Sequence, residues 1–280
     1  MNRPADTELP PPADRLRPLR SLAPQRLVGL RGLLTDIDDT LTRDGAIEPV
    51  ALAALHRLAA AAVPVIAITG RPAGWSLPMV QAWPVAAIVA ENGGVLLTRD
   101  AASPLGVLTR HLVGDAERAT HFARLQCCAA AVLAEVPATV LAQDSAGRLT
   151  DIAIDHSEFA SLAAAQIDAV VAVMRRHGLT ATVSSIHING WIGEHNKWTG
   201  ARWAVETVLG CKFDASEWIY VGDSTNDQLM FERVPLSIGV ANVARFLPVM
   251  AWPPAWVTVA KRGQGFGEVV ACLLSARSGR

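Results

Sequence analysis

Short apolar segments alternate with helix-like stretches along the first third of the chain. Apolar runs at residues 30–36, 63–68 and 85–90 have the length and composition of buried strands. Between them, residues 49–62 and 73–83 carry apolar side chains at helical spacing. Strands that alternate with helices through short connections predict a parallel sheet with helices on both faces.

The pattern changes at residue 95. A long alanine-rich helix is predicted at 116–135 and a second helix at 158–177, with strands at 148–155 and 180–188. Polar and apolar residues alternate in the segment TDIAIDHS, which is typical of an antiparallel sheet with one face open to solvent. We therefore expect a separate α+β unit over residues 95–189.

The parallel-sheet pattern returns in the last third, with a helix at 197–209 and a strand at 218–221 as clear elements. The predicted fold class is therefore α/β. A doubly wound, Rossmann-like parallel sheet is built from residues 28–94 and 190–280, and the α+β unit is inserted between them. Residues 1–27 hold six prolines and scattered charges, and we expect a disordered lead-in there.

The composition excludes several functional classes. Of 280 residues, 51% are apolar and 18% are charged, and the net charge of −1 gives no electrostatic basis for binding nucleic acid or an anionic membrane. The apolar runs are too short to span a bilayer, and the N-terminus has no signal-peptide core. The four cysteines lack CxxC spacing, as expected for free thiols in a reducing compartment. We expect a cytoplasmic protein and leave its oligomeric state open.

Three carboxylates follow the first predicted strand, in LLTDIDDTL. Asp36 and Asp38 project to the same side if the strand continues through them, and Asp39 projects to the other. Two carboxylates about 4 Å apart repel by roughly 4 kcal/mol at an effective dielectric constant of about 20. A folded chain tolerates this repulsion when a cation, a proton or a substrate resolves it.

Polar side chains also follow three further predicted strands, at residues 69–71, 91–93 and 222–227, and Lys197 opens the helix after the insertion. Each group alone has a structural explanation, such as a helix N-cap or a turn. Ligands of parallel sheets, however, bind beyond the carboxyl ends of the strands. Polar groups at four strand ends therefore point to one site.

Four segments, DIDDTLT, ITGRP, HNKWTG and YVGDSTND, resemble in order the four motifs of the haloacid dehalogenase superfamily of phosphohydrolases. The insertion at ENGG resembles the type 2 (IIB-like) caps of that superfamily. This subgroup includes phosphatases for sucrose phosphate, trehalose phosphate and mannosyl-3-phosphoglycerate. The resemblance implies that residues 95–189 form a cap domain that sets specificity, and that the partner is a small phosphorylated metabolite such as a sugar phosphate.

The resemblance also implies roles for matching positions. Asp36 would be the nucleophile that forms an aspartyl-phosphate, and Asp38 the general acid that then serves as base. The chemistry agrees, because an alkoxide is a poor leaving group and a nearby protonated carboxyl assists its departure. Mg²⁺ would be held by the Asp36 carboxylate, the backbone carbonyl of Asp38 and Asp223.

Further matching positions would bind the phosphate. Lys197 would supply positive charge to the nucleophile and the phosphoryl oxygens, and Thr69 a hydroxyl donor. Gly70 would let the backbone approach the phosphate closely. Arg71 and Asn226 complete the predicted phosphate-binding set.

Four acidic or amide residues have outer roles or none. Asp227, with Asn226, would hold a metal-bound water or Lys197. Asn242, in GVAN, falls where the family often has an asparagine near the site. Asp39 is expected to face away from Asp38 and to take no part in the chemistry.

The cap is expected to choose the substrate. Ser185, His187 and Asn189 alternate, so we expect them to share one strand face, which is either solvent-exposed or substrate-facing. Further candidates in this unit are Arg148, Asp155, His156 and Trp191.

Two other functions stay open. A phosphomutase shares the core and the aspartyl-phosphate, and a catalytically silent protein could bind the same metabolites, although the intact Asp36 and Asp38 argue against silence. A calcium-binding EF-hand loop starting at Asp36 is excluded, because its sixth and twelfth positions are Leu41 and Ile47 instead of Gly and Glu.

Overall fold

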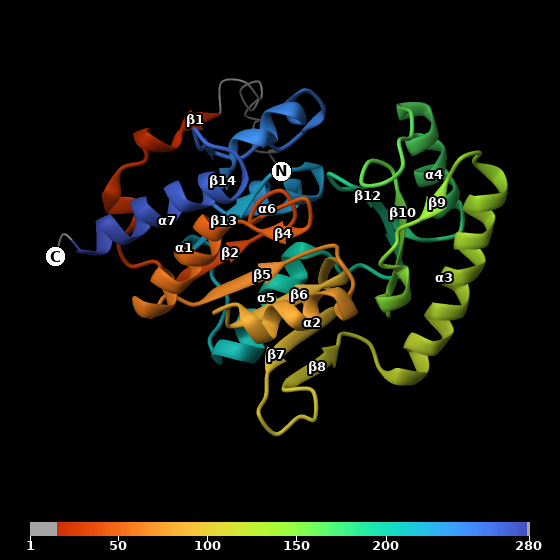
Figure 1. Ribbon diagram of the computed structural model, residues 1–280, viewed down its shortest axis with the longest axis horizontal. Coiled ribbons are helices and arrows are strands. Elements are labelled where there is room, and N and C mark those ends of the chain that lie inside the picture. The colour runs from red at the N-terminus through yellow and green to blue at the C-terminus, as the bar shows by residue number, and fades with distance from the viewer. Residues whose placement is uncertain (1–15, 279–280) are drawn as a thin grey trace, which may run out of the picture.

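The computed structural model describes residues 16–278, which form a core around a large central sheet and a smaller cap beside it (Figure 1). Within these residues the central sheet has nine strands, in the order β1-β15-β14-β13-β2-β5-β6-β7-β8. Its pairs are parallel from β1 to β6 and antiparallel from β6 to β8. The strands are β1 (Arg17–Pro18), β2 (Gly32–Thr35), β5 (Val65–Ile68), β6 (Ala87–Ala90), β7 (Val95–Arg99), β8 (Val107–His111), β13 (Trp218–Gly222), β14 (Leu236–Gly239) and β15 (Trp256–Val257).

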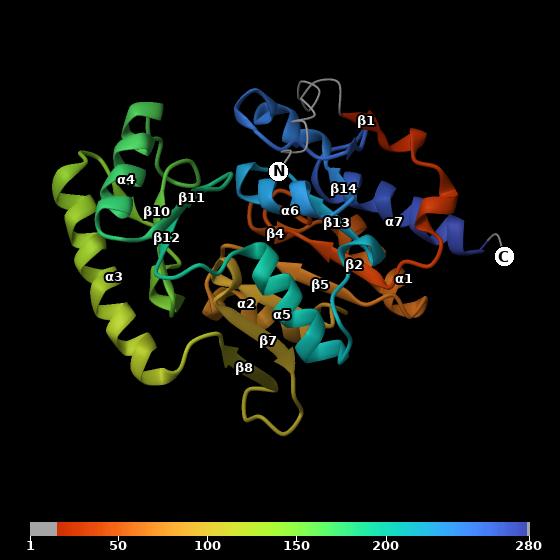
Figure 2. The same cartoon turned by 180° about the vertical axis from the view of Figure 1, so that it is seen from behind.

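Helices cover both faces of this sheet (Figures 1 and 2). One face packs against α1 (Pro49–Ala60), α2 (Ala73–Ala82) and α7 (Arg262–Ser278), and the other against α5 (Lys197–Leu209) and α6 (Gln228–Arg233). Leu33 and Leu34 are neighbours on β2 and belong to the two different apolar clusters, as a strand buried on both sides requires. The predicted α/β class is confirmed. None of the helices in residues 16–278 has the length and apolar character needed to cross a membrane.

The cap is a four-stranded antiparallel sheet with two helices on its outer side (Figure 1). Ile152, Ile154 and Ile188 pack against the helices, so the alternate residues of those strands face the core. The elements are α3 (Asp115–Glu135), β9 (Val140–Leu141), β10 (Asp151–Asp155), α4 (Ala164–Arg176), β11 (Thr180–Val183) and β12 (His187–Trp191), with strand order β11-β12-β10-β9. A separate small hairpin, β3 (Thr42–Arg43) and β4 (Ala46–Ile47), follows β2.

The cap begins later than residue 95, where the sequence predicted its start. β7 and β8 extend the central sheet as antiparallel edge strands. A tight turn at residues 91–94 folds β7 back onto β6, and Gly93 supports it with φ 116°. At the other end Gly190 and Trp191 still belong to the cap strand β12.

Residues 180–188 form a hairpin, so the prediction of a single strand is wrong. The Ser184 hydroxyl accepts hydrogen bonds from the N–H groups of Ile186 and His187, at 3.3 and 3.0 Å, and closes the turn. Ser185 lies in this turn, and only His187 and Asn189 share a strand face.

The second cap helix also starts later than predicted, at Ala164 instead of 158. The Asp155 carboxylate accepts hydrogen bonds from the N–H groups of Glu158 and Phe159, both at 2.9 Å. This side chain holds the start of the segment as a turn, because it satisfies N–H groups that a helix would otherwise use.

Residues 16–27 are packed onto the core, so the prediction of a disordered lead-in is wrong for them. Leu19, Leu22 and Leu27 are buried in the core cluster, and β1 pairs with β15. Arg17 stacks over the ring of Trp256, 4.1 Å from its centre. The rest of that prediction, residues 1–15, lies outside the described residues.

Candidate active site

Parallel pairing brings the ends of β2, β5 and β13 together at one edge of the central sheet. Thr35, the last residue of β2, lies opposite Val221 on β13 and Ala67 on β5. The N–H of Asp36 continues this ladder by donating to the Val221 carbonyl at 2.8 Å. The residues that follow the three strands therefore meet, namely Asp36, Thr69 and Asp223.

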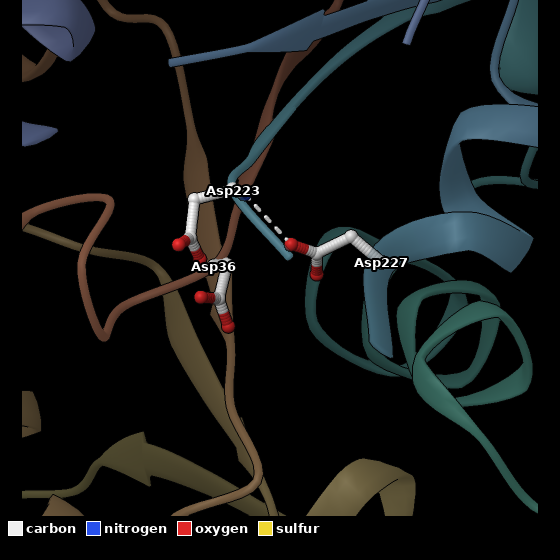
Figure 3. A group of neighbouring side chains, drawn as sticks. All are labelled: Asp36, Asp223 and Asp227. Carbon is white, nitrogen blue, oxygen red and sulfur yellow. Dashed lines mark hydrogen bonds between the residues drawn. The ribbon is translucent and has the colours of Figure 1, made fainter. Parts of the chain in front are cut away.

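Three buried carboxylates gather at this edge (Figure 3). Asp36, Asp223 and Asp227 each place one oxygen within 4.8 Å of the others, as a metal site requires. Burial raises the pKa of Asp36 to about 8, with Lys197 opposing the shift and Asp227 and Asp38 adding to it. Burial also raises the pKa of Asp223, and the charges of Asp36 and Asp227 act in the same direction.

Lys197 compensates part of this negative charge. It opens α5, where a cation is disfavoured by the helix dipole. Its position is explained by the acids that it meets, because Nζ donates to Asp36 Oδ1 at 2.6 Å and to Asp227 Oδ1 at 2.7 Å. Burial acts to lower the pKa of Lys197, but these two carboxylates raise it above its ordinary value. The amine is therefore charged, and it also donates to Asn226 at 3.2 Å.

Both oxygens of Asp227 are already engaged. Oδ1 accepts hydrogen bonds from Lys197 and from the Tyr220 hydroxyl, and Oδ2 accepts one from the Asp223 N–H at 2.8 Å. Gly222 makes this approach possible, because a Cβ there would lie 2.4 Å from Asp227 Oδ2. Asp227 thus positions Lys197 and the loop.

Asp223 has an oxygen to spare. Its Oδ2 accepts a hydrogen bond from Asn242 Nδ2 at 2.9 Å, whereas its Oδ1 is buried without a hydrogen-bond partner among residues 16–278. An unpaired buried carboxylate oxygen is costly unless a cation binds it. Asp36 and Asp223 therefore fit a hard cation with oxygen ligands.

Arg71 links the second aspartate of the motif to the cap. Its Nε lies 3.1 and 3.2 Å from the two carboxylate oxygens of Asp38 and donates to them. The same guanidinium donates to Glu158 at 2.6 Å and to Asp144 at 3.1 Å, both in the cap. The Thr69 hydroxyl lies 3.5 Å from Asp38 Oδ2. Arg71 therefore joins the core to the cap.

Glu158 is also held by His187, whose Nε2 lies 2.8 Å from Glu158 Oε2. Burial acts to raise the pKa of Glu158, but hydrogen bonds from His187 and Arg71 outweigh it and lower the pKa to about 2. Glu158 therefore presents a negative charge to the site at neutral pH.

The carbonyl of Gly70 accepts hydrogen bonds from two cap side chains. Arg148 donates to it at 3.0 Å and Asn189 at 3.3 Å. Arg148 is buried and forms a second contact with Asp151 at 2.8 Å. These bonds fix the cap against the loop after β5.

Two cavities meet at Asp38. The smaller one brings together most of the residues predicted from sequence, and Lys197 joins the set through its contacts with Asp36 and Asn226. The larger cavity, of about 270 Å³, shares Asp38 and Arg71 with it. The smaller cavity is lined by Asp36, Asp38, Thr69, Gly70, Arg71, Ser184, Ser185, Ile186, His187, Asn189, Ser224 and Asn226.

Several residues at the site were not predicted. Glu158 and Asp144 lie in irregular cap segments that carry no motif. Tyr220 could have been found, because a tyrosine inside a buried strand needs a hydrogen-bond partner for its hydroxyl. Asp39 was expected to face away from Asp38, and its carboxylate contacts Arg245 and Arg262.

Comparison with known proteins gives a family match over the first part of the core. Residues 33–107 match the family model of haloacid dehalogenase-like hydrolases. No curated protein sequence matches the chain.

Solved structures with the same fold cover almost all of the chain. A sucrose-phosphatase from Synechocystis sp. PCC6803, in complex with sucrose and phosphate, is 14% identical with a TM-score of 0.62, over 87% of this chain and 98% of that one. The C-terminal domain of trehalose-6-phosphate phosphatase from C. albicans is 12% identical with a TM-score of 0.64, over 93% and 99%. A subclass IIB sugar phosphatase is 12% identical with a TM-score of 0.59, over 89% and 99%. At such identities the likeness establishes the fold, a mostly parallel sheet with an antiparallel cap of subclass IIB.

Proposed function

We propose that this chain, a haloacid dehalogenase-like hydrolase with a IIB-type cap, hydrolyses a small phosphate monoester with Mg²⁺ through an aspartyl-phosphate intermediate. The main support for this proposal is the position of two carboxylates in one cavity. Asp36, which accepts a hydrogen bond from Lys197 at 2.6 Å, lines the same cavity as Asp38. One carboxylate can attack phosphorus while the other exchanges a proton with the leaving oxygen. The sucrose-phosphatase of the same fold supports a sugar phosphate or a related metabolite as substrate.

The reaction has two half-reactions. In the first, an Asp36 carboxylate oxygen attacks phosphorus, the bond from phosphorus to the leaving oxygen breaks, and Asp38 in its acid form gives that oxygen a proton. In the second, water attacks the phosphorus of the aspartyl-phosphate, Asp38 accepts a proton from the water, and Asp36 is regenerated. The products are an alcohol and inorganic phosphate, and Asp38 is again protonated.

The smaller cavity, of about 10 Å³, must widen to admit a phosphoryl group, and the residues around it then bind that group. Lys197 and Asn226 approach it from the side of α5 and the loop after β13, and Thr69 offers its hydroxyl. Arg71 now donates to Asp38, and a phosphate in the cavity offers this guanidinium a competing dianionic acceptor. Transfer of Arg71 to the phosphate releases Asp38 for its acid role.

Mg²⁺ is the cation we propose for the acid cluster, held by Asp36, the backbone carbonyl of Asp38 and Asp223. The donors are all oxygens, and the unpartnered Asp223 Oδ1 gives the site an open ligand. When bound, the ion neutralises phosphate charge and orients the phosphoryl group. Asp227, with both oxygens engaged, keeps Lys197 in place.

The direct test is phosphate release by purified protein from an aryl phosphate and from a panel of phosphorylated sugars and acids. We expect turnover with Mg²⁺, loss in excess EDTA and recovery when Mg²⁺ is restored. Full activity in EDTA would contradict the metal assignment. An isomeric phosphate ester with little free phosphate would identify a phosphomutase instead, and retention of ligand without turnover a silent binding protein.

A further inference from the structure

The larger cavity lies where the alcohol part of the substrate must extend. Asp36 lines only the smaller cavity, whereas Asp38 lines both. Because Asp38 is the proposed acid for the leaving oxygen, that oxygen lies beside it. The alcohol beyond this oxygen therefore enters the cavity of about 270 Å³.

Two arginines line this cavity and share one carboxylate. Asp39 accepts a hydrogen bond from Arg245 Nη2 at 2.9 Å and from Arg262 Nε at 2.7 Å. Arg245 Nη2 also lies 3.5 Å from Asp223 Oδ2. The side chains of Arg245 and Arg262 are 46% and 28% exposed, so both can meet a ligand. Among residues 16–278, most of their N–H donors meet no hydrogen-bond acceptor.

Two other acids of the cavity lie against a third cation. Asp38 and Glu158 both contact Arg71, at 3.1 and 2.6 Å, and share its single positive charge. Asp44 is exposed to solvent, where its field is screened. Arg245 and Arg262 carry two positive charges against the one carboxylate of Asp39, with Asp223 3.5 Å from Arg245, so the wall beside Asp39 is locally cationic.

Backbone conformation shows that this wall is held in place. Asp39 and Arg262 both have positive φ, 54° and 51°, which is unfavourable for residues other than glycine. Asn242 fixes both, because its Nδ2 donates to the Asp39 carbonyl and its Oδ1 accepts from the Arg262 N–H, each at 3.0 Å. Such strain persists where the surroundings impose it, and it often marks a binding site.

We infer that the leaving alcohol of the substrate carries its own anionic group, a carboxylate or a second phosphate, which Arg245 and Arg262 bind. The planar guanidinium group suits either anion, because it can donate two parallel hydrogen bonds. This inference rests on the proposed phosphatase function and narrows its substrate class to acidic phosphate monoesters. Asp39 is the residue that positions the two arginines.

The test compares pairs of phosphate esters in which one member carries a second acidic group and the other does not. The pairs are glucose 6-phosphate with 6-phosphogluconate, glycerol 3-phosphate with 3-phosphoglycerate, and fructose 6-phosphate with fructose 1,6-bisphosphate. We expect kcat/KM to favour the acidic member of at least one pair by about tenfold or more, as hydrogen bonds to charged groups do. The first two pairs report a carboxylate and the third a second phosphate.

Arg262→Gln should reduce this preference several-fold, mainly by raising KM for the acidic ester, and Arg262→Lys should retain part of it. Arg262 is chosen because Arg245 also approaches the proposed metal ligand Asp223. Arg176→Gln is the matched control, since Arg176 pairs with Glu135 on the exposed surface of the cap.

The kcat/KM preference for the acidic ester decides whether Arg245 and Arg262 bind a second anionic group. A wild-type enzyme that prefers the acidic member in none of the three pairs would overturn the inference and leave the phosphatase function standing. A folded Arg262→Gln protein with an unchanged preference would also overturn it. If no ester at all were hydrolysed, the proposed function would fail first.

Discussion

The core and the cap both bring charged groups to one cavity, but they stabilise them in opposite ways. In the core, Asp36 and Asp223 are crowded at adjacent strand ends, and burial raises the pKa of Asp36 to about 8. In the cap, Glu158 finds its own partners in Arg71 and His187, and its pKa falls to about 2. The core carboxylates need a cation or a proton from outside. The cap carboxylate Glu158 already has a partner in the core, Arg71, and one in the cap, His187. On the proposed function, this contrast places the chemistry in the core, while the cap holds Arg71 through Glu158.

Neutralising the proposed nucleophile should have the largest effect on activity. Asp36→Asn should lower kcat by about 10⁴-fold or more, because no other residue can replace a nucleophile that forms a covalent bond. The measurement is steady-state phosphate release with Mg²⁺. Asp168→Asn, an exposed carboxylate on α4, is the control and should keep full activity. Near-normal turnover of Asp36→Asn would overturn the assignment.

Removing the cation of the core should affect both activity and stability. Lys197→Met leaves Asp36 and Asp227 buried without their shared ammonium, and breaking such a pair from one side costs about 3–5 kcal/mol. The free energy of unfolding, from urea denaturation, should fall by that order. Turnover should fall by about 10²–10³-fold, as when one electrostatic donor to a transition state is lost. An unchanged unfolding free energy would show that Lys197 does not compensate the cluster.

The corresponding change in the cap should be milder. Glu158→Gln weakens the contacts with Arg71 and His187, and we expect kcat/KM to fall by about tenfold, in keeping with a hydrogen bond to a charged group. Glu135→Gln is the matched control on the cap surface. A loss as large as that of Asp36→Asn would place chemistry in the cap and contradict its assignment to the core.

The acid cluster of the core should also give a pH dependence of stability that the metal removes. The pKa of Asp36 rises from 3.8 to about 8 on folding, so the folded chain holds a proton that the unfolded chain releases. In EDTA this contribution is fully present below about pH 4 and is lost as the pH rises toward 8, by about 1.4 kcal/mol per pH unit.

Thermal unfolding in EDTA at pH 5, 6, 7 and 8 measures this slope, with about 2–4 °C expected for each kcal/mol. Saturating Mg²⁺ should flatten it, because the ion replaces the proton as the partner of Asp36. A slope of the same size with and without Mg²⁺ would contradict the cluster as a metal site.

Much of the core site could be predicted because its geometry follows from local sequence. A strand that ends in Asp36 and another that ends in Asp223 must bring these residues to one edge once the strands pair in parallel. Lys197 was found through its motif. Its partner Asp227 lies only four residues after Asp223, within the same loop segment.

The rest depends on contacts that the local pattern does not contain. The apolar run of β7 fits either sheet, so the start of the cap was placed too early. Glu158 lies in a turn created by Asp155, and Arg262 meets Asp39 across 223 positions of sequence. Proline-rich composition predicted disorder for residues 16–27, where Leu19 and Leu27 supply enough apolar contact to fix the segment.

The central claim is that Asp36 carries the phosphoryl group during turnover. Enzyme with Mg²⁺ and a saturating good substrate is quenched in acid within one turnover, digested and analysed by mass spectrometry for phosphorylated peptides. We predict a phosphoryl group on the carboxylate of Asp36, absent from Asp36→Asn protein and from enzyme quenched after EDTA treatment. Rapid turnover with no label on Asp36, or with the label on another residue, would contradict the account.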